Sequence, residues 1–395
     1  MRKRTVTPRL PALTLLAVSL ASFTALCVLH DATMTDLLVY RAEGAAVAHG
    51  TDLYGFTVTK WHLPATYPPF AAILFVPADW MPVPALKAAS LAGNALLLLA
   101  LVALSARLAH RTLSLPLLCT ATALALWLEP VFQTFTFGQI NLAVVCLVLW
   151  DLTRPPGARA RGLALGLATG IKLTPALFVV LLLLRGHRRE AATATAGLAA
   201  TVLLGVLLLP AASADFWTRR LYETGRVGKA WIVDNQSLQG LIARVLHDPA
   251  PGVAWTLPAA ALAVAGSVLA GRARHESHGI LLTAFTALLV CPISWTHHWV
   301  WCVPLLAVLL AEGRTRTAAL VALVFTARTM WLLPHEGALD LELPWWQQPL
   351  AAAYPLLGIG LLISYGSMIG RCPILSTEQT GKQECPSRPF RSARR

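Results

Sequence analysis

The chain has 395 residues, of which 56% are hydrophobic and only 13% are charged. Soluble domains carry about 25% charged residues, and the strands of a membrane β-barrel alternate apolar with polar residues, so both classes are excluded. Uncharged apolar runs such as 96–104, 142–150 and 198–209 predict an all-α, polytopic helical membrane protein. The net charge of +13 is assigned to cytoplasmic loops and tails, because no aromatic residues alternate with the basic ones as they do in a nucleic-acid site.

The expected helices alternate with polar connections, and Lys and Arg collect at every second connection. The positive-inside rule then places both termini in the cytoplasm and gives about ten full crossings. The segment 68–81 is too short to cross, and we expect it to lie along the outer interface. A single transmembrane domain covers 1–370 with external loops at about 30–83 and 211–251, and a basic, disordered cytoplasmic tail covers 371–395. The crossings are expected near 11–29, 84–108, 114–129, 138–152, 191–210, 252–271, 279–295, 298–312, 316–333 and 350–369.

The apolar segment 162–184 does not fit this alternation. It is long enough to cross once, yet basic residues flank both of its ends, and Lys172 and Pro175 stand in its middle. A lysine at mid-bilayer costs about 3 kcal/mol, and a proline interrupts the helical hydrogen bonds. A broken, re-entrant pair of half-helices accommodates these features if protein or a wet cavity surrounds the break. The alternative is an ordinary span in which Lys172 snorkels to the interface.

Polar side chains that could carry chemistry gather on the external side of this topology. They include a carboxylate, two histidines, two cations and several amides, and Lys172 would reach the same place from below. A one-sided cluster of this kind indicates a site for a lipid-borne substrate. Its members are Asp36, Tyr40, Tyr67, Pro68, Pro69, Gln139, Asn141, Arg226, Lys229, Asn235, Gln236, His297 and His298.

The sequence predicts no cofactor and no metal site. The seven cysteines form no CxxC pair, and most of them lie inside apolar runs, which predicts buried free thiols. There is no HExxH motif and no glycine-rich phosphate loop. His297 and His298 are adjacent, so on a helix they would point to different sides and form no two-ligand face.

Six short motifs follow one another along the chain. They are Asp36-Leu-Leu-Val-Tyr40, Tyr67-Pro-Pro-Phe70, Gly138-Gln-Ile-Asn141, Gly170-Ile-Lys-Leu-Thr-Pro175, Asn235-Gln-Ser-Leu238 and Ser294-Trp-Thr-His-His298. In this order they resemble glycosyltransferase family 87, whose members are GT-C type, polyprenyl-phosphate-mannose-dependent α-(1→2)-mannosyltransferases. The resemblance runs from the first helix to about residue 330 and identifies the family better than the acceptor.

The resemblance implies an inverting sugar transfer from a polyprenyl-phosphate donor to a glycolipid or glycan acceptor, outside the cytoplasmic membrane. The acceptor hydroxyl needs a base, and Asp36 matches the family's aspartate in the first external loop. Asp31 is its nearest rival, but Asp31 lacks a tyrosine four residues on. A donor of this kind, held in the lipid bilayer, needs no nucleotide site and no cofactor.

The resemblance also implies binding roles. The departing phosphate needs positioned cations, for which Lys172 and His298 are the better candidates and His297, Arg226 and Lys229 the others. The amides expected to hold sugar hydroxyls are Gln139, Asn141, Asn235 and Gln236. The structural parts of the motifs are Tyr40, Tyr67, Pro68, Pro69 and Pro175.

A second class of protein shares some of these features. A broken helix with a mid-membrane cation is also typical of transporters, so a polyprenyl-linked sugar or lipid flippase is the alternative. Inverted repeats would favour that class, and the sequence shows none.

Overall fold

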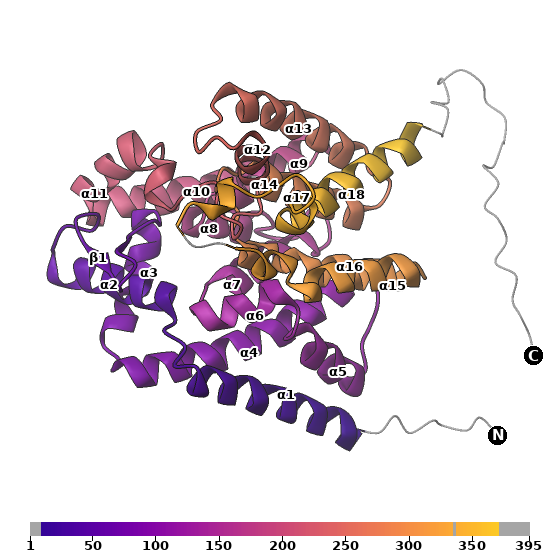
Figure 1. Cartoon of the computed structure of the whole chain (residues 1–395), viewed down its shortest axis with the longest axis horizontal. Helices are drawn as coiled ribbons and strands as arrows, with labels where there is room; N and C mark the ends of the chain where they lie inside the picture. The colour runs from indigo at the N-terminus through magenta and orange to yellow at the C-terminus, as the bar shows by residue number, and fades with distance from the viewer. Residues whose placement is uncertain (1–8, 335–336, 371–395) are drawn as a thin grey trace, which may run out of the picture.

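The computed structural model of the protein describes residues 9–334 and 337–370, so the expected tail at 371–395 lies outside the described residues. The described part is an α-helical bundle, as predicted (Figure 1). Its helices are α1 (Arg9–Leu29), α2 (Thr35–His49), α3 (Pro69–Asp79), α4 (Val83–Leu108), α5 (Leu115–Ala125), α6 (Glu129–Phe137), α7 (Asn141–Leu152), α8 (Leu163–Ile171), α9 (Leu177–Leu184), α10 (Arg188–Leu208), α11 (Pro210–Asp215), α12 (Leu238–Leu246), α13 (Val253–Arg272), α14 (Glu276–Val290), α15 (Cys302–Ala311), α16 (Thr315–Ala327), α17 (Gln348–Ala351) and α18 (Ala353–Gly370).

Shorter helical turns connect several of these helices. They are η1 (Thr174–Ala176), η2 (Phe216–Arg220), η3 (Thr224–Arg226), η4 (Thr296–Trp301), η5 (Thr329–Leu332) and η6 (Leu339–Leu341). Within the described ranges there is one sheet, an antiparallel pair of β1 (Thr57–Val58) and β2 (Leu63–Pro64), with Thr57 opposite Pro64.

Among the described helices, α1, α4, α10 and α13 are each long and apolar enough to cross a membrane. The pair α5 and α6 would add a fifth crossing if it is one bent span, and seven further apolar helices have 10–17 residues. Large apolar side chains on α10, such as Leu203 and Leu207, are exposed and suit contact with lipid. The protein is therefore a multi-pass helical membrane protein, while the expected number of ten crossings remains a prediction.

The expected span at 114–129 differs from the structure. Helix α5 ends at Ala125, and α6 runs on from Glu129 at an angle of 76° to it. Leu128 has an extended backbone and Pro130 stands in the first turn of α6, where proline suits the start of a new helix but not the continuation of an old one. The bend carries α6 and the turn after it toward α2.

The segment 30–83, expected to be the first external loop, is a folded unit rather than an irregular segment. Helices α2 and α3 pack closely, since a Cβ on Gly44 would lie 2.2 Å from the carbonyl oxygen of Phe75. The unit lies with α11 on the left of Figure 1, and around Tyr54 it has a small apolar core to which Phe216 of η2 contributes. The sequence indicated only a polar stretch there, because the functional residues of α2 interrupt its apolar pattern.

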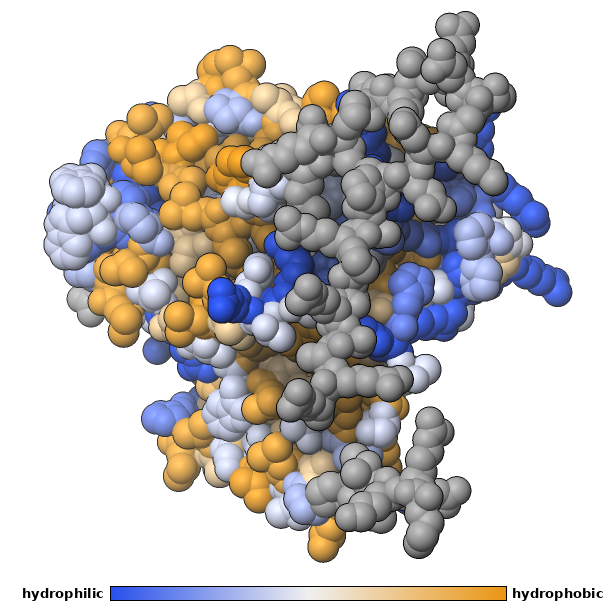
Figure 2. All heavy atoms as spheres, turned by 90° about the vertical axis from the view of Figure 1, so that its right-hand side faces the viewer, coloured by the Kyte–Doolittle hydropathy of each residue, from blue (hydrophilic) through white to orange (hydrophobic). Residues whose placement is uncertain are grey.

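Basic connections meet at the opposite end of the bundle. Arg111 donates a hydrogen bond to the carbonyl of Ala311 at the turn between α15 and α16, and Glu312 of that turn pairs with His278 at the start of α14. The start of α1 and the end of α18 lie at the same end, on the right of Figure 1. Figure 2 looks onto this end, where hydrophilic side chains gather across the middle and the right.

The segment 163–184 is interrupted, as predicted. Helix α8 ends at Ile171, Lys172 has an extended backbone (φ −147°, ψ 125°), and the chain resumes through η1 into α9. Both ends of the segment lie near the same turn between α13 and α14: Arg161 pairs with Glu276 at 2.7 Å, and Arg185 donates to the carbonyl of Ala273 at 2.8 Å.

Helix α8 packs closely and in parallel on α10. Cβ atoms built on Gly162, Gly166 and Gly170 would lie 2.2, 2.3 and 2.2 Å from Glu190, Ala194 and Thr201 of α10, in increasing order along both helices. Only glycine allows so close an approach of two helices. Since α9 joins α10 through a tight turn at 185–187, the chain doubles back between α8 and α9. The break at Lys172 is therefore the tip of a helical hairpin.

Candidate active site

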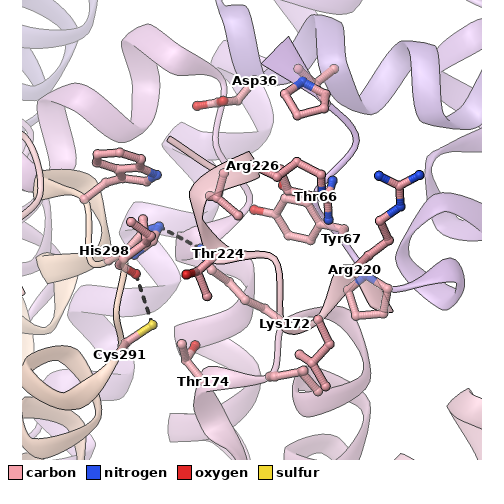
Figure 3. A pocket seen from close by; sticks show the side chains of 18 of the residues that line it. Asp36, Thr66, Tyr67, Lys172, Thr174, Arg220, Thr224, Arg226, Cys291 and His298 are labelled. Carbon is pink, nitrogen blue, oxygen red and sulfur yellow. Dashed lines mark hydrogen bonds between the residues drawn. The ribbon is translucent and has the colours of Figure 1, made fainter. Parts of the chain in front are cut away.

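A cavity of about 390 Å³ lies between the first external loop, the tip of this hairpin, and the segment 291–298 (Figure 3). Its lining combines one carboxylate with several cations and a wall of apolar and aromatic side chains. In the view of Figure 3, Asp36 lies across the cavity from Lys172, and His298 lies across from Arg220. The polar and charged lining residues are Asp36, Tyr40, Thr66, Tyr67, Gln139, Lys172, Thr174, Arg220, Thr224, Arg226, Cys291, Trp295 and His298.

Asp36 stands in the first turn of α2, where the positive end of the helix dipole favours a carboxylate. Among the residues that line the cavity it is the only acid. Its Oδ2 accepts a hydrogen bond from Nε2 of Gln139 at 2.7 Å. Burial raises the pKa of Asp36 to about 6, against the lowering effects of the Gln139 hydrogen bond and of the positive charge on Lys172. The carboxylate is therefore mostly ionised at neutral pH and able to accept a proton.

A second carboxylate lies two turns further along the same helix. Glu43 is fully buried and accepts a hydrogen bond from the backbone N–H of Thr66 at 3.1 Å, but it does not line the cavity. Burial raises the pKa of Glu43 to about 8, so this side chain is mostly neutral at pH 7. The two acids of α2 thus differ in charge, and Asp36 is the one available as a base.

Lys172 brings a cation to the opposite wall. Its Nζ donates to Oδ1 of Asn141 at 2.8 Å and lies 2.9 Å from Nε2 of His298 and 5.7 Å from the ring centre of Tyr67. An ammonium group only donates, so Nε2 of His298 is the acceptor and the ring proton is on Nδ1. No acid in the described residues lies within ion-pair distance of Lys172, so its charge is available to an anionic ligand.

Two arginines of the expected second external loop, at about 211–251, also line the cavity. Arg226 donates to the carbonyl of Ala65 and stacks 5.6 Å from the ring centre of Tyr54. Arg220, which the sequence did not single out, is held by Asp215 at 2.8 Å and by Glu223 at 3.5 Å. Because no ion pair of Arg226 is found in the described residues, Arg226 is the less neutralised of the two.

Several residues predicted for the site are absent from the cavity lining. Lys229 stacks on the ring of Trp231, and the buried ring of His297 lies edge-on to Phe137 at 5.4 Å. Asn235 and Gln236 are fully buried, and their amides bond to backbone groups.

The bonds of Asn235 and Gln236 hold the second external loop against the segment that presents His298. The amide of Asn235 bonds to the carbonyl of Pro292 at 2.9 Å and to the N–H of Ser294 at 2.8 Å. The backbone of Gln236 donates to the carbonyl of Ser294 at 2.8 Å. These two amides therefore support the site from behind and do not face it.

Asn141 lines a second, smaller cavity of about 40 Å³, the extension, which shares Lys172 and His298 with the first. Its amide nitrogen donates to the carbonyl of His297 at 3.0 Å, and its oxygen accepts from Lys172. The extension is otherwise mostly apolar, with Val145, Phe178 and Trp301 among its walls. Asn141 thus orients the Lys172 ammonium group and ties α7 to η4.

Sequence reasoning missed Arg220, Thr66, Thr174, Cys291 and Trp295 as lining residues. Thr66 adjoins a motif, and Thr174 and Trp295 are each part of one, so those motifs were the available signal. The glycines at 162, 166 and 170, spaced four apart, were a signal for the close packing that places Lys172. Nothing in the sequence distinguishes Arg220 from the basic residues beside it.

In residues 9–334 and 337–370, no three His, Cys, Asp or Glu side chains are close enough together to hold a metal ion. What the cavity offers is one ionised carboxylate facing a set of cations. That arrangement can accept a proton on one side and hold an anionic group on the other.

Comparisons with known proteins identify the family of the chain. The model of glycosyltransferase family 87 matches residues 65–294. A polyprenol-phosphate-mannose-dependent α-(1-2)-phosphatidylinositol mannoside mannosyltransferase of Mycobacterium tuberculosis is 32% identical over 369 residues, which are 85% of each chain. The protein of the same name from Mycolicibacterium smegmatis is 32% identical and covers 84% of this chain and 83% of its own.

A third relative has a related name. The polyprenol-phosphate-mannose-dependent α-(1-2)-phosphatidylinositol pentamannoside mannosyltransferase of Mycobacterium tuberculosis is 34% identical over 73% of this chain and 68% of its own. No solved structure matches the chain. The resemblance seen in the six motifs is confirmed, and the chain belongs to glycosyltransferase family 87.

Proposed function

We propose that the protein transfers mannose from a polyprenyl-phosphate donor to a hydroxyl group of a glycolipid or glycan acceptor. The observation that carries the proposal is the placement of Asp36 and of the Lys172–His298 pair on two walls of one cavity. The names of the relatives support a mannosyl donor on polyprenol phosphate, and they favour a phosphatidylinositol mannoside as the acceptor.

The proposed reaction is a single displacement. A carboxylate oxygen of Asp36 takes the proton of the acceptor hydroxyl while the acceptor oxygen forms a bond to C1 of the sugar. The bond from C1 to the phosphate oxygen breaks, and polyprenyl phosphate leaves with the bonding electrons. One step of this kind inverts the configuration at C1. A double displacement would need a second carboxylate at the sugar, and Asp36 is the only acid in the described lining.

Lys172 and His298 are the proposed binding groups for the leaving phosphate. The ammonium group of Lys172 stabilises the negative charge that develops as the C1–O bond breaks. His298 holds this ammonium in place through Nε2, and Arg226 offers a further cation from the second external loop. Six other predicted binders are not part of the proposed contact set: Gln139 and Asn141, which bond to Asp36 and Lys172, and Lys229, His297, Asn235 and Gln236.

The proposed location is the outer face of the cytoplasmic membrane, with both termini in the cytoplasm. Two observations support it: the basic connections meet at one end of the bundle, and the cavity belongs to the loops of the other end. The helical hairpin of α8 and α9 would then enter the membrane from the cytoplasmic side and leave on that side. The number of about ten crossings belongs to the same proposal.

An assay of membranes with radiolabelled polyprenyl-phosphate mannose tests the proposed function. Incorporation of label into a glycolipid or glycan, with release of polyprenyl phosphate, is the expected result. Movement of the intact donor between leaflets without transfer would overturn the proposal in favour of a flippase.

A further inference from the structure

Gln139 is the contact through which the tertiary structure holds Asp36. It follows Gly138, which ends α6 with a positive φ of 68°. A Cβ on Gly138 would lie 2.7 Å from Cβ of Leu37, the residue next to Asp36. The turn therefore lies directly against the start of α2, and Gln139 reaches the carboxylate from it.

Both the nitrogen and the oxygen of the Gln139 amide are hydrogen-bonded within the protein. Its nitrogen donates to Oδ2 of Asp36 at 2.7 Å, and its oxygen accepts from the hydroxyl of Tyr40 at 2.7 Å. The hydroxyl of Tyr67 lies 3.3 Å from the same oxygen and 2.9 Å from the hydroxyl of Tyr40. All three of these polar side chains are buried. Such an arrangement is costly to break, because a buried amide or hydroxyl without a partner loses its hydration.

The network has a fixed direction. The carboxylate only accepts hydrogen bonds, so the amide nitrogen of Gln139 must face it. The amide oxygen then faces the tyrosines and accepts from the hydroxyl of Tyr40, the nearer of the two. A rotated amide would place its oxygen against the carboxylate of Asp36, so the two tyrosines and the acid together specify one orientation.

This network occupies one carboxylate oxygen of Asp36 with a hydrogen bond and leaves the other oxygen without a side-chain partner. Gln139 is the one side-chain hydrogen-bond partner found for Asp36 in the described residues, and it contacts Oδ2. Asp36 lines the cavity, so Oδ1 is the oxygen available to a substrate. This use of Gln139 differs from the sugar-binding role that the sequence indicated.

We propose that Gln139 is a positioning residue for the base: it holds Oδ2 of Asp36 so that Oδ1 faces the acceptor hydroxyl, and Tyr40 and Tyr67 fix its amide. The inference rests on the proposed function, because it assigns Asp36 the role of base. The proposal gives a common role to three motifs from separate segments of the chain, those around Asp36, Tyr67 and Gln139: together they fix the orientation of one carboxylate.

Replacement of Gln139 by leucine tests the inference. Loss of the held orientation should lower kcat about 10- to 100-fold, as small misplacements of catalytic groups do, with the KM for acceptor little changed. The hydrogen bond from Gln139 favours the ionised carboxylate. Its loss should therefore move the acid limb of the pH–rate profile to higher pH. The variant leaves unchanged the other titratable groups whose charges interact with that of Asp36. They are Lys172, Tyr40, Tyr67 and Glu43.

A matched control is Gln133→Leu. Gln133 lies in α6, the helix that ends just before Gln139. Its side-chain oxygen accepts a hydrogen bond from Thr136 at 2.8 Å, and it does not line the cavity. This variant should keep both the rate and the acid limb. Tyr40→Phe removes one hydroxyl only and should change kcat and the acid limb in the same direction as Gln139→Leu, by less. It serves as the second test if Gln139→Leu does not accumulate in membranes.

The outcomes separate the inference from the proposed function. Wild-type membranes that transfer no mannose would overturn the proposed function itself. If wild type is active and Gln139→Leu keeps kcat and its acid limb, the positioning role is wrong. A raised KM for acceptor with kcat and the acid limb unchanged would also overturn it, and would return Gln139 to the sugar-binding role.

Discussion

Nζ of Lys172 lies 2.9 Å from Nε2 of His298, although 126 residues separate the two in the chain. One residue is at the tip of the hairpin between α8 and α9, and the other is in η4. Their contact places a cation of the hairpin at the wall of the cavity. The hairpin, whose glycines pack on α10, thus positions the ammonium group of Lys172 at the cavity.

The base is tested by Asp36→Asn. The amide keeps the size of the side chain but does not accept the acceptor proton, so transfer should fall about 10²- to 10⁴-fold. Asp31→Asn is the matched control, because Asp31 is exposed in the same external region and should change the rate little. The measurement is mannose transfer per amount of protein in membranes. Near wild-type transfer by Asp36→Asn would remove the main support for the proposed mechanism.

The pH dependence follows from the raised pKa of Asp36. The base works in its ionised form, and burial places its pKa at about 6. The rate should therefore fall about tenfold per unit below this pH and level off between it and neutral pH. Glu43→Gln is the control: Glu43 titrates near pH 8 and is already neutral at pH 6, so the acid limb should stay where it is. If Glu43→Gln moves the acid limb, the limb reports the titration of Glu43 and not of Asp36.

The phosphate-binding role is tested by Lys172→Met, which keeps the length of the side chain without its charge. We expect weaker use of the donor, seen as a raised KM for donor and a lower kcat, because the leaving phosphate loses its cation. Lys172→Arg should also perform poorly, since the planar guanidinium does not fit the two partners that the ammonium has. Wild-type turnover by Lys172→Met would assign Lys172 to the snorkelling alternative.

The placement of the hairpin is tested by labelling single cysteines. Gly157→Cys and Gly186→Cys lie before and after the segment, at positions with open space around them. Both should react with a membrane-impermeant thiol reagent only when the cytoplasmic side is accessible. Gly50→Cys, at an equally open position after α2, should react from outside. Reaction of Gly186→Cys from outside would make 163–184 an ordinary span.

The contact of α8 with α10 is tested by Gly166→Ala. The new Cβ would lie 2.3 Å from the carbonyl oxygen of Ala194, and overpacking of this kind costs about 1–3 kcal/mol. The variant should lower the unfolding temperature in detergent and reduce transfer by displacing Lys172. Gly93→Ala in α4 is the control, since nothing lies within 4 Å of its Cβ, and it should be neutral or slightly stabilising. Equal unfolding temperatures of the two variants would contradict the close packing.

The membrane class, most helices and the break at Lys172 could be predicted from the sequence alone. The length of an apolar run and the charge of its flanks are local properties, and they determine for each segment separately whether and in which direction it crosses the bilayer. The expected helices at 84–108, 191–210 and 252–271 correspond to α4, α10 and α13 for this reason. The six motifs likewise identified the family, because they needed only order along the chain.

Which polar groups meet was decided by the tertiary structure. An amide can bind a sugar hydroxyl, a carboxylate or a backbone carbonyl, and its sequence neighbours do not distinguish these partners. Gln139 reaches Asp36 across 103 residues, whereas Asn235 bonds to the backbone of the segment beside it. The bend between α5 and α6 and the close packing at Gly138 bring that turn to α2. The residue types of the site are thus a property of the sequence, while their roles depend on distances that only the folded chain defines.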